Sequence, residues 1–211
     1  MSGGDGVRIR PITDADWDAI VAMESRTYAD LGLSEGRAAL RSRADASPDT
    51  CFVLDVGARP AGYLMALPYP PSAYPDLERA EEAEPSPSSA PGNLHLHDIV
   101  VVERLRGRGW GRRLLDHLTV TAGALGFERI SLIAVGCSEP FWSARGFSPC
   151  PGIVPAGYGA HAVYMSKAVS PARPQAMAQA MSQAMSQAMS QATPRATAES
   201  TKRVDVRVPC P

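Results

Sequence analysis

A short turn rich in glycine and arginine is the segment of this chain best suited to bind an anion. It is Arg106-Gly107-Arg108-Gly109-Trp110-Gly111, and it lies between a Val-rich run and a segment with helical periodicity. Glycine lets the backbone approach a ligand closely, and the start of a helix offers unpaired N–H groups and positive potential. The arrangement favours binding of a phosphate group, in particular a pyrophosphate.

Other glycine-rich loops differ from this turn in spacing or context. A Walker A loop requires Gly-Lys-Ser/Thr, which is absent, and a dinucleotide fingerprint requires GxGxxG where this chain has GxGxG. Arg-Gly segments that contact RNA normally belong to disordered tracts, not to the junction of a strand and a periodic helix. A basic helix start that binds no ligand is the remaining alternative interpretation.

Two histidines, His95 and His97, precede the turn in the pattern His-Leu-His. Alternate residues of a strand share a face, so both imidazoles are expected to point the same way. An amine with a pKa near 10.4 is almost wholly protonated at pH 7, with on the order of one molecule in 10³ free to attack. An imidazole can accept its proton, directly or through water. A hydrogen-bonded core pair and a His-x-His metal site are alternatives, but no third ligand is evident and we expect no metal.

Strand-like and helix-like segments surround these residues. Six runs have the β-branched or apolar character of strands, at 7–10, 51–56, 61–67, 94–102, 130–135 and 162–166. Four segments have the spacing or capping residues of helices, one beginning after Thr13 and the others at 34–46, 109–125 and 138–146. Strands mixed with helices in this irregular order predict an α+β fold, a sheet of mixed direction covered by helices.

The glycine turn resembles the Gln/Arg-x-x-Gly-x-Gly/Ala pyrophosphate loop of the GCN5-related N-acetyltransferase (GNAT) superfamily. An apolar strand precedes it, an amphipathic helix follows it, and Phe141-Trp142-Ser143-Ala144-Arg145-Gly146-Phe147 looks like that family's FYxxxGF segment. The likeness covers roughly residues 7–167. It implies a mixed, mostly antiparallel central sheet with splayed parallel strands, flanked by helices, and acetyl-coenzyme A (acetyl-CoA) as the co-substrate.

The resemblance also implies which residues bind the coenzyme. Backbone groups of Ile99, Val100 and Val101 would bond the pantetheine and the thioester carbonyl, although valines here would equally suit an ordinary core. The pyrophosphate would be bound by the turn and the first helical residues, which are Arg106, Gly107, Arg108, Gly109, Trp110, Gly111 and Arg112.

The histidine pair is most similar in pattern to the arylalkylamine (serotonin-type) N-acetyltransferases, whose strand histidines are assigned to a water-linked proton path. By that likeness His97 is the catalytic base and His95 its partner. Tyr28 falls where relatives place an aromatic residue beside the acceptor cleft, with a place in the core as the alternative.

The chain departs from the family pattern at Trp142, where relatives usually have a Tyr that protonates the leaving thiolate. An indole N–H has no useful acidity near neutral pH. We therefore interpret Trp142 as an aromatic wall beside the coenzyme. Water, or one of Tyr158, Tyr164 and Cys137, would have to replace the missing Tyr, or the thiolate would leave unprotonated.

Composition divides the chain into two regions. Residues 1–167 form the predicted acetyltransferase-like domain, which includes a Pro-rich acidic loop at 68–93. Residues 168–211 carry a Gln-Ala-Met repeat and no Leu, Ile, Phe, Tyr or Trp, so we predict a disordered tail. The formal net charge of −1 is the sum of two opposite charges. Residues 1–167 contain 16 basic and 20 acidic residues, whereas the tail contains five basic and two acidic residues.

The overall composition excludes several classes of protein. A balanced charge argues against a general nucleic-acid binder, and no apolar run reaches the roughly 18 to 20 residues of a membrane span. The first residues lack the apolar core of a secretory signal and the four cysteines are scattered, so we expect a cytoplasmic protein with reduced thiols. The sequence does not indicate the oligomeric state.

Together these features predict an acetyl-CoA-dependent N-acetyltransferase that acts on a small, arylalkylamine-like primary amine by direct attack. Two alternatives stay open. One is an acetyltransferase for protein N-termini, lysine side chains or an aminoglycoside-like amine. The other is a catalytically degenerate acyl-CoA-binding or partner-binding module, which is suggested by Trp142 and the Met repeat.

Overall fold

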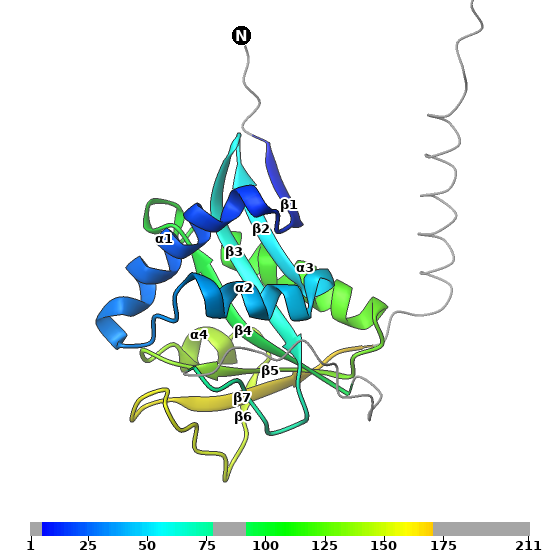
Figure 1. Ribbon diagram of the computed structural model, residues 1–211. Helices are drawn as coiled ribbons and strands as arrows, with labels where there is room; N and C mark the ends of the chain where they lie inside the picture. The colour runs from blue at the N-terminus through cyan, green and yellow to red at the C-terminus, as the bar shows by residue number, and fades with distance from the viewer. Residues whose placement is uncertain (1–5, 78–91, 171–211) are drawn as a thin grey trace, which may run out of the picture. The chain divides into compact units, whose positions relative to one another are not determined.

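The computed structural model describes residues 6–77 and 92–170 (Figure 1). The chain divides into two units, Met1–Ala172 and Arg173–Pro211, and the second lies wholly outside the described residues. The predicted tail is therefore outside the description from residue 171 on, as is the stretch 78–91 of the predicted Pro-rich loop. The described fold continues past residue 167, since Val169 is buried in the core.

Seven strands and four α-helices make up the described fold. The strands are β1 Val7–Pro11, β2 Cys51–Val56, β3 Arg59–Pro68, β4 Asn93–Val101, β5 Arg129–Ala134, β6 Ser148–Pro149 and β7 Val163–Ala168. The α-helices are α1 Trp17–Tyr28, α2 Arg37–Ala46, α3 Trp110–Ala124 and α4 Glu139–Ser143. None of the helices in the described ranges is long and apolar enough to span a membrane.

All seven strands form one sheet in the order β1-β2-β3-β4-β5-β7-β6. The neighbours are antiparallel except β4 and β5, which are parallel. A parallel pair needs a crossover, and α3 supplies it between these two strands. The predicted α+β fold with a mostly antiparallel central sheet flanked by helices is confirmed.

The two faces of the sheet carry separate cores. On one face Leu114, Leu115 and Leu118 of α3 pack with alternate residues of the central strands and with Trp142 and Phe147. On the other face α1 and α2 bury a second cluster, which comprises Trp17, Ile20, Met23, Leu40, Ala44, Cys51, Val53, Tyr63, Met65 and Val100. The i, i+4 spacing of apolar residues in α3 is what directs one stripe of that helix at the sheet.

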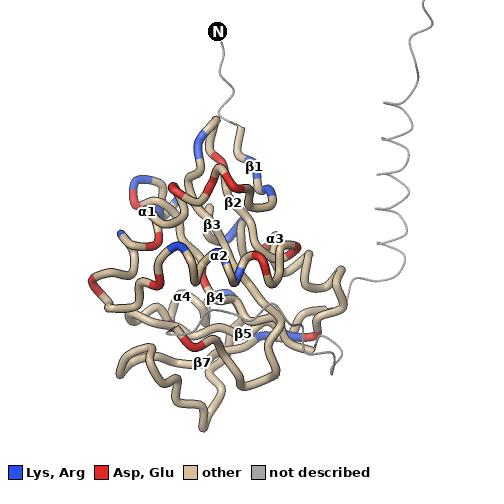
Figure 2. The backbone as a smooth tube through the Cα atoms, viewed as in Figure 1, with Lys and Arg blue, Asp and Glu red and all other residues tan. Residues whose placement is uncertain are grey.

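Arg10 ties the first strands to the start of α1. Its guanidinium donates to both carboxylate oxygens of Asp16, at 2.6 and 2.7 Å, and to Asp55 on β2 at 2.7 Å. Asp16 in turn accepts from the backbone N–H of Thr13 at 2.8 Å. The basic and acidic positions of β1, β2 and the start of α1 are neighbours in space (Figure 2). This cluster fixes where α1 begins, and α1 carries part of the site described below.

Candidate active site

A cavity of about 660 Å³ opens where the two parallel strands separate. The pairing of β4 with β5 runs only from Asn93↔Arg129 to Leu96↔Leu132, yet both strands continue beyond it. The cavity is lined by the continuation of β4, by Ile133 and Val135 beside it, by α1 and by the start of α3. It therefore joins the histidine strand to the glycine turn.

The glycine turn delivers the N-terminus of α3 to one end of the cavity. Gly107 and Gly109 have φ values of +75° and +83°, in the left-handed region that L side chains rarely adopt. Gly109 is the residue before α3, no side chain caps the helix, and its first turn has no acidic residue. The indole N–H of Trp110 is buried there without a hydrogen-bond partner among the described residues. This end therefore offers several free donors to an anion.

Nearly all of the residues predicted to bind the coenzyme line this cavity. They are Ile99, Val100, Val101, Arg106, Gly107, Gly109, Trp110, Gly111 and Arg112. Arg108 is exposed and is not one of the lining residues. The Arg106 side chain turns back to the protein, where Nε donates to the Val101 carbonyl at 3.1 Å.

A β-bulge sets the orientation of His97. Asp98 pairs with Met65 and Leu96 pairs with Ala66, so His97 is the extra residue on β4. Bulges re-aim side chains in this way. As a result His97 and Asp98 both bond to residues of the α1 and α2 side, although they are consecutive in the chain.

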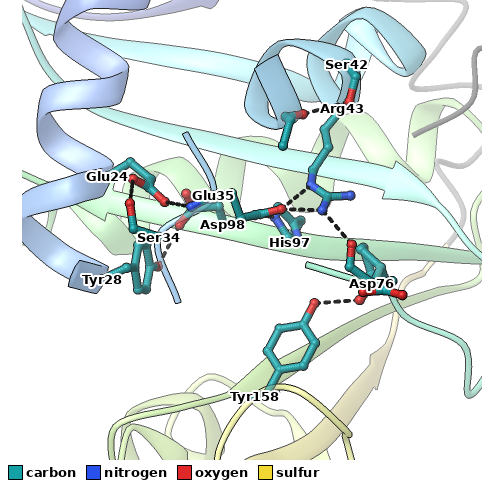
Figure 3. A network of polar contacts seen from close by, with 12 residues as sticks. Glu24, Tyr28, Ser34, Glu35, Ser42, Arg43, Asp76, His97, Asp98 and Tyr158 are labelled. Carbon is teal, nitrogen blue, oxygen red and sulfur yellow. Dashed lines mark hydrogen bonds and ion pairs between the residues drawn. The ribbon is translucent and has the colours of Figure 1, made fainter. Parts of the chain in front are cut away.

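His97 is one end of a buried charge network (Figure 3). Its Nε2 lies 2.5 Å from Oε1 of Glu35, and Arg43 Nε donates to the other oxygen of Glu35 at 3.0 Å. Arg43 is completely buried and also donates to the Asp76 carbonyl at 3.0 Å. Burial acts to raise the pKa of Glu35, but bonds and charges from His97 and Arg43 outweigh it and hold that pKa below its usual value. Glu35 is therefore an anion directed at the imidazole.

The second nitrogen of His97 differs from the first in having no partner among the described residues. Nδ1 is buried and has no hydrogen-bond partner within the described part of the chain, and His97 lines the cavity. When Nε2 carries the proton and donates it to Glu35, Nδ1 holds a free lone pair. The geometry thus gives an oriented imidazole with one unpartnered acceptor among the described residues, as in a nucleophile-activating dyad.

Asp98 forms a second buried group beside His97. Its carboxylate accepts from the Tyr28 hydroxyl at 2.6 Å and from the Tyr63 hydroxyl. Burial raises the pKa of Asp98 to about 6, against the opposing effect of His97 and of the two phenols. Tyr28 and Asp98 line the cavity, so Tyr28 lies at the cleft as the sequence predicts.

His95 has different surroundings although it is only two residues away. It is 1% exposed, its Nδ1 lies 3.0 Å from the Ser131 hydroxyl, and its ring stacks on Tyr164. Burial lowers the pKa of His95 to about 3, so the imidazole is neutral. His95 is absent from the lining of the cavity.

The aromatic segment after β5 forms a wall of the cavity. Trp142 lines it, donates its indole N–H to the Ser138 hydroxyl at 3.2 Å, and packs edge-on against Phe147. Of the three groups considered in place of the missing Tyr, Tyr158 lines the cavity, whereas Tyr164 stacks on His95 and Cys137 is exposed. The Tyr158 hydroxyl donates to the Pro75 carbonyl at 2.8 Å.

Three residues of the network were not identified from the sequence. Asp98 follows His97 directly, and a carboxylate inside an otherwise apolar strand is a usable signal. Glu35 and Arg43 carry no such signal, since they lie in an ordinary polar stretch 62 and 54 positions from His97. The described residues contain no group of three His, Cys, Asp or Glu side chains that could hold a metal ion.

Comparison with known proteins finds one family model and several solved structures that are similar to this chain. Residues 17–147 match the family model described as the acetyltransferase (GNAT) family. The structure is similar to Ard1 from Thermoplasma volcanium, with a TM-score of 0.59 and 16% identity over 77% of this chain and 97% of that one. It is also similar to the loading GNATL domain of CurA from Lyngbya majuscula, with a TM-score of 0.61 and 15% identity over 78% and 98% of the two chains.

A third similar structure is N-acetylglutamate synthase from Neisseria gonorrhoeae, complexed with coenzyme A and N-acetyl-glutamate. The TM-score is 0.59 and the identity 16%, over 78% of this chain and 35% of that one. At such identities a structural likeness shows the fold alone. No curated protein matches the chain by sequence.

Proposed function

Because the chain belongs to the acetyltransferase (GNAT) family, and is thereby an acetyl-CoA-dependent N-acetyltransferase, we propose that it acetylates a small, arylalkylamine-like primary amine with His97 as the general base. One observation carries this proposal: a single cavity joins the free N-terminus of α3 to an imidazole whose Nδ1 is unpartnered among the described residues.

Acetyl-CoA supplies the acetyl thioester, and this chain supplies an anion site and an open strand edge for it. We assign the pyrophosphate to the main-chain N–H groups from Gly107 through Arg112, which begin α3. We assign the pantetheine and the thioester carbonyl to the backbone of 99–101, because β4 has left its parallel partner there. Trp142 forms the aromatic wall of this half of the cavity.

The charges near His97 favour a cationic acceptor. Three carboxyl side chains, those of Glu24, Glu35 and Asp98, line the cavity at this end. Arg43, the cation that pairs with Glu35, lies behind it and does not line the cavity. An amine arrives as an ammonium ion and is attracted here, whereas the carboxylate of an amino-acid acceptor is repelled.

Several other lining residues are apolar or aromatic. They include Tyr28, Leu31, Leu33, Leu77 and Tyr158. Such a lining suits an amine attached to a short aromatic or aliphatic body, and it would leave the polar backbone of a peptide without partners. This is the reason for preferring a small amine to a protein N-terminus or a lysine side chain.

The proposed reaction is a direct transfer. Nδ1 of His97 first takes one proton from the ammonium ion, which leaves a neutral amine. The amine nitrogen then forms a bond to the thioester carbonyl carbon, the C–S bond breaks, and the nitrogen releases its second proton to solvent. Glu35 stabilises the imidazolium that results, at 2.5 Å from Nε2. Burial raises the pKa of Tyr158, which makes its hydroxyl a weak acid. The thiolate therefore takes its proton from solvent in this mechanism.

His95 has a supporting role in this proposal. It is enclosed by Ser131 and Tyr164 and has no opening to the cavity. A neutral imidazole in that position holds β4 against β5 and β7, and it takes no proton from the substrate. The partnership with His97 expected from the arylalkylamine pattern is thus reduced to positioning.

The function is tested by release of free thiol from acetyl-CoA in the presence of an acceptor panel. The panel contains arylalkylamines, aliphatic amines, amino acids and peptides with free N-termini or lysines. The proposal predicts that small amines are the best substrates. Peptides as the best substrates would support the protein acetyltransferase instead, and binding of acetyl-CoA with no turnover on any acceptor would identify a degenerate module.

The base is tested by the His97→Ala variant. Turnover should fall about 10²-fold near pH 7 and less near pH 9, because more of the amine is already deprotonated there. His161→Ala is the matched control, since His161 is exposed and outside the cavity lining, and it should leave turnover unchanged. An equal loss at both pH values would show that His97 is not the proton acceptor.

A further inference from the structure

Arg145 presents an unused donor in the lining of the cavity that also contains His97. The residue follows α4 and lines the cavity. Its Nε is buried, and within the described ranges it makes no hydrogen bond. A buried N–H of a charged group is normally paired, so an orphan of this kind points to a partner that a ligand supplies.

The Arg145 side chain is held in place before any ligand arrives. One terminal nitrogen donates to the Phe141 carbonyl at 2.6 Å, and the guanidinium carbon lies 3.4 Å from the centre of the Phe141 ring. The backbone N–H of Arg145 donates to the Trp142 carbonyl at 2.8 Å. A guanidinium fixed in this way loses little conformational freedom when it binds an anion.

A second guanidinium belongs to a residue that lines the same cavity as Arg145. Burial, and next the charge of Arg112, lower the pKa of Arg145, while Asp116 acts in the opposite direction. Arg112 belongs to the first turn of α3 and lines the same cavity, and its ion pair with Asp116 is exposed and 3.6 Å long. Two like charges that face one cavity are stabilised by an anion between them.

Acetyl-CoA carries a pyrophosphate and a 3′-phosphate. The two arginines suit the 3′-phosphate, to which the glycine turn is not assigned. The turn and the α3 N-terminus fit the pyrophosphate, as proposed above. The 3′-phosphate on the ribose is a monoester, which carries a charge between −1.5 and −2 near neutral pH, like a phosphorylated side chain. Planar guanidinium groups bind such a group through paired N–H donors. We propose that Arg112 and Arg145 bind the 3′-phosphate of acetyl-CoA, so that this protein selects coenzyme A over its dephosphorylated form.

The experiment is a binding measurement without an acceptor, so its result is independent of His97 and of the acceptor proposed above. Calorimetry gives the Kd of coenzyme A and of 3′-dephospho-coenzyme A for the wild type, Arg145→Gln and Arg112→Gln. The wild type should bind coenzyme A at least about tenfold more tightly than the dephospho form. Arg145→Gln should remove most of that preference and leave the affinity for the dephospho form within about twofold of wild type.

Two further variants separate the proposal from loss of folding or of general charge. Arg145→Lys keeps the charge without the planar fork and should retain part of the preference. Arg59→Gln removes a charge from an exposed position outside the cavity lining and should keep all of it. The proposal is overturned if the wild type binds both ligands equally, or if Arg145→Gln weakens both by the same factor, which would place Arg145 at the pyrophosphate or in the support of α4.

Discussion

Replacing Arg43 with methionine should destabilise the protein far more than the same change at a neighbouring arginine. Arg43 is 0% exposed, and it donates to Glu35 at 3.0 Å and to the Asp76 carbonyl at 3.0 Å. The variant leaves the Glu35 carboxylate buried without its cation. Removal of one partner from a buried ion pair costs about 3–5 kcal/mol, which corresponds to a fall of about 6–20 °C in Tm for a folded region of this size.

Arg41 provides the matched control, because it lies on the same helix and pairs with Asp14 at the surface. That pair spans 2.7 Å and the Arg41 side chain is 47% exposed, so Arg41→Met should cost about 1 kcal/mol or less. Urea unfolding near neutral pH, followed by circular dichroism, compares the two variants. The double variant Glu35→Gln/Arg43→Met leaves no unpaired cation or anion at the pair and should cost less than the two single changes added together.

The same variants test whether the pair positions His97. At a temperature where Arg43→Met is folded, kcat should fall about tenfold while KM for acetyl-CoA stays unchanged, because Arg43 reaches His97 through Glu35 and does not line the cavity. If Arg43→Met loses no more stability than Arg41→Met, the argument from buried charge is refuted. If kcat stays at the wild-type value, the positioning role is refuted as well.

Three other perturbations have outcomes set by single observations. The pKa of Asp98 is raised to about 6, so ionisation of this carboxyl group destabilises the folded protein between about pH 4 and pH 6. Asp98→Asn cannot ionise, so its free energy of unfolding should rise relative to that of wild type by up to about 3 kcal/mol over this pH range. A difference between the two proteins that stays constant with pH in urea unfolding would contradict this. A hydrogen bond from Arg10 lowers the pKa of Asp16 to about 2, so the stability that the ionised carboxylate contributes is present above about pH 4 and is lost as the pH falls through about 2. Asp16→Asn should therefore lower the free energy of unfolding by about 1–3 kcal/mol at pH 7 and by progressively less in acid, as measured by urea unfolding. Gly109→Ala places a side chain at a φ of +83°, so it should lower the free energy of unfolding by about 1–2 kcal/mol. It should also raise KM for acetyl-CoA, and an unchanged KM in steady-state kinetics would argue against coenzyme binding at this turn.

Local sequence signals were sufficient to locate the glycine turn and the strand and helix beside it. The glycine turn, the strand before it and the helix after it are consecutive in the chain, so their spacing alone predicts a helix N-terminus facing an anion. The predicted helix 109–125 is α3, Trp110–Ala124, and the predicted strand 94–102 is β4, Asn93–Val101. The family match over residues 17–147 includes this part of the chain.

The surroundings of the two histidines depend on contacts that no local sequence pattern encodes. The two histidines are alike in sequence context, yet the bulge opposite Met65 and Ala66 leaves His97 at the cavity, while Ser131 and Tyr164 enclose His95. Burial and partners decide the protonation of an imidazole, and both are supplied by strands far away in the sequence.

The sequence by itself determined the family, the α+β class and the position of the glycine turn, because a family match, periodicity and spacing are all properties of residue order. Only the tertiary structure decided that Glu35 and Arg43 stand behind His97 and that Arg145 faces the same cavity as Arg112. Side chains on separate elements meet through packing of the whole domain, so neither their distance nor their charge state can be derived from spacing along the chain.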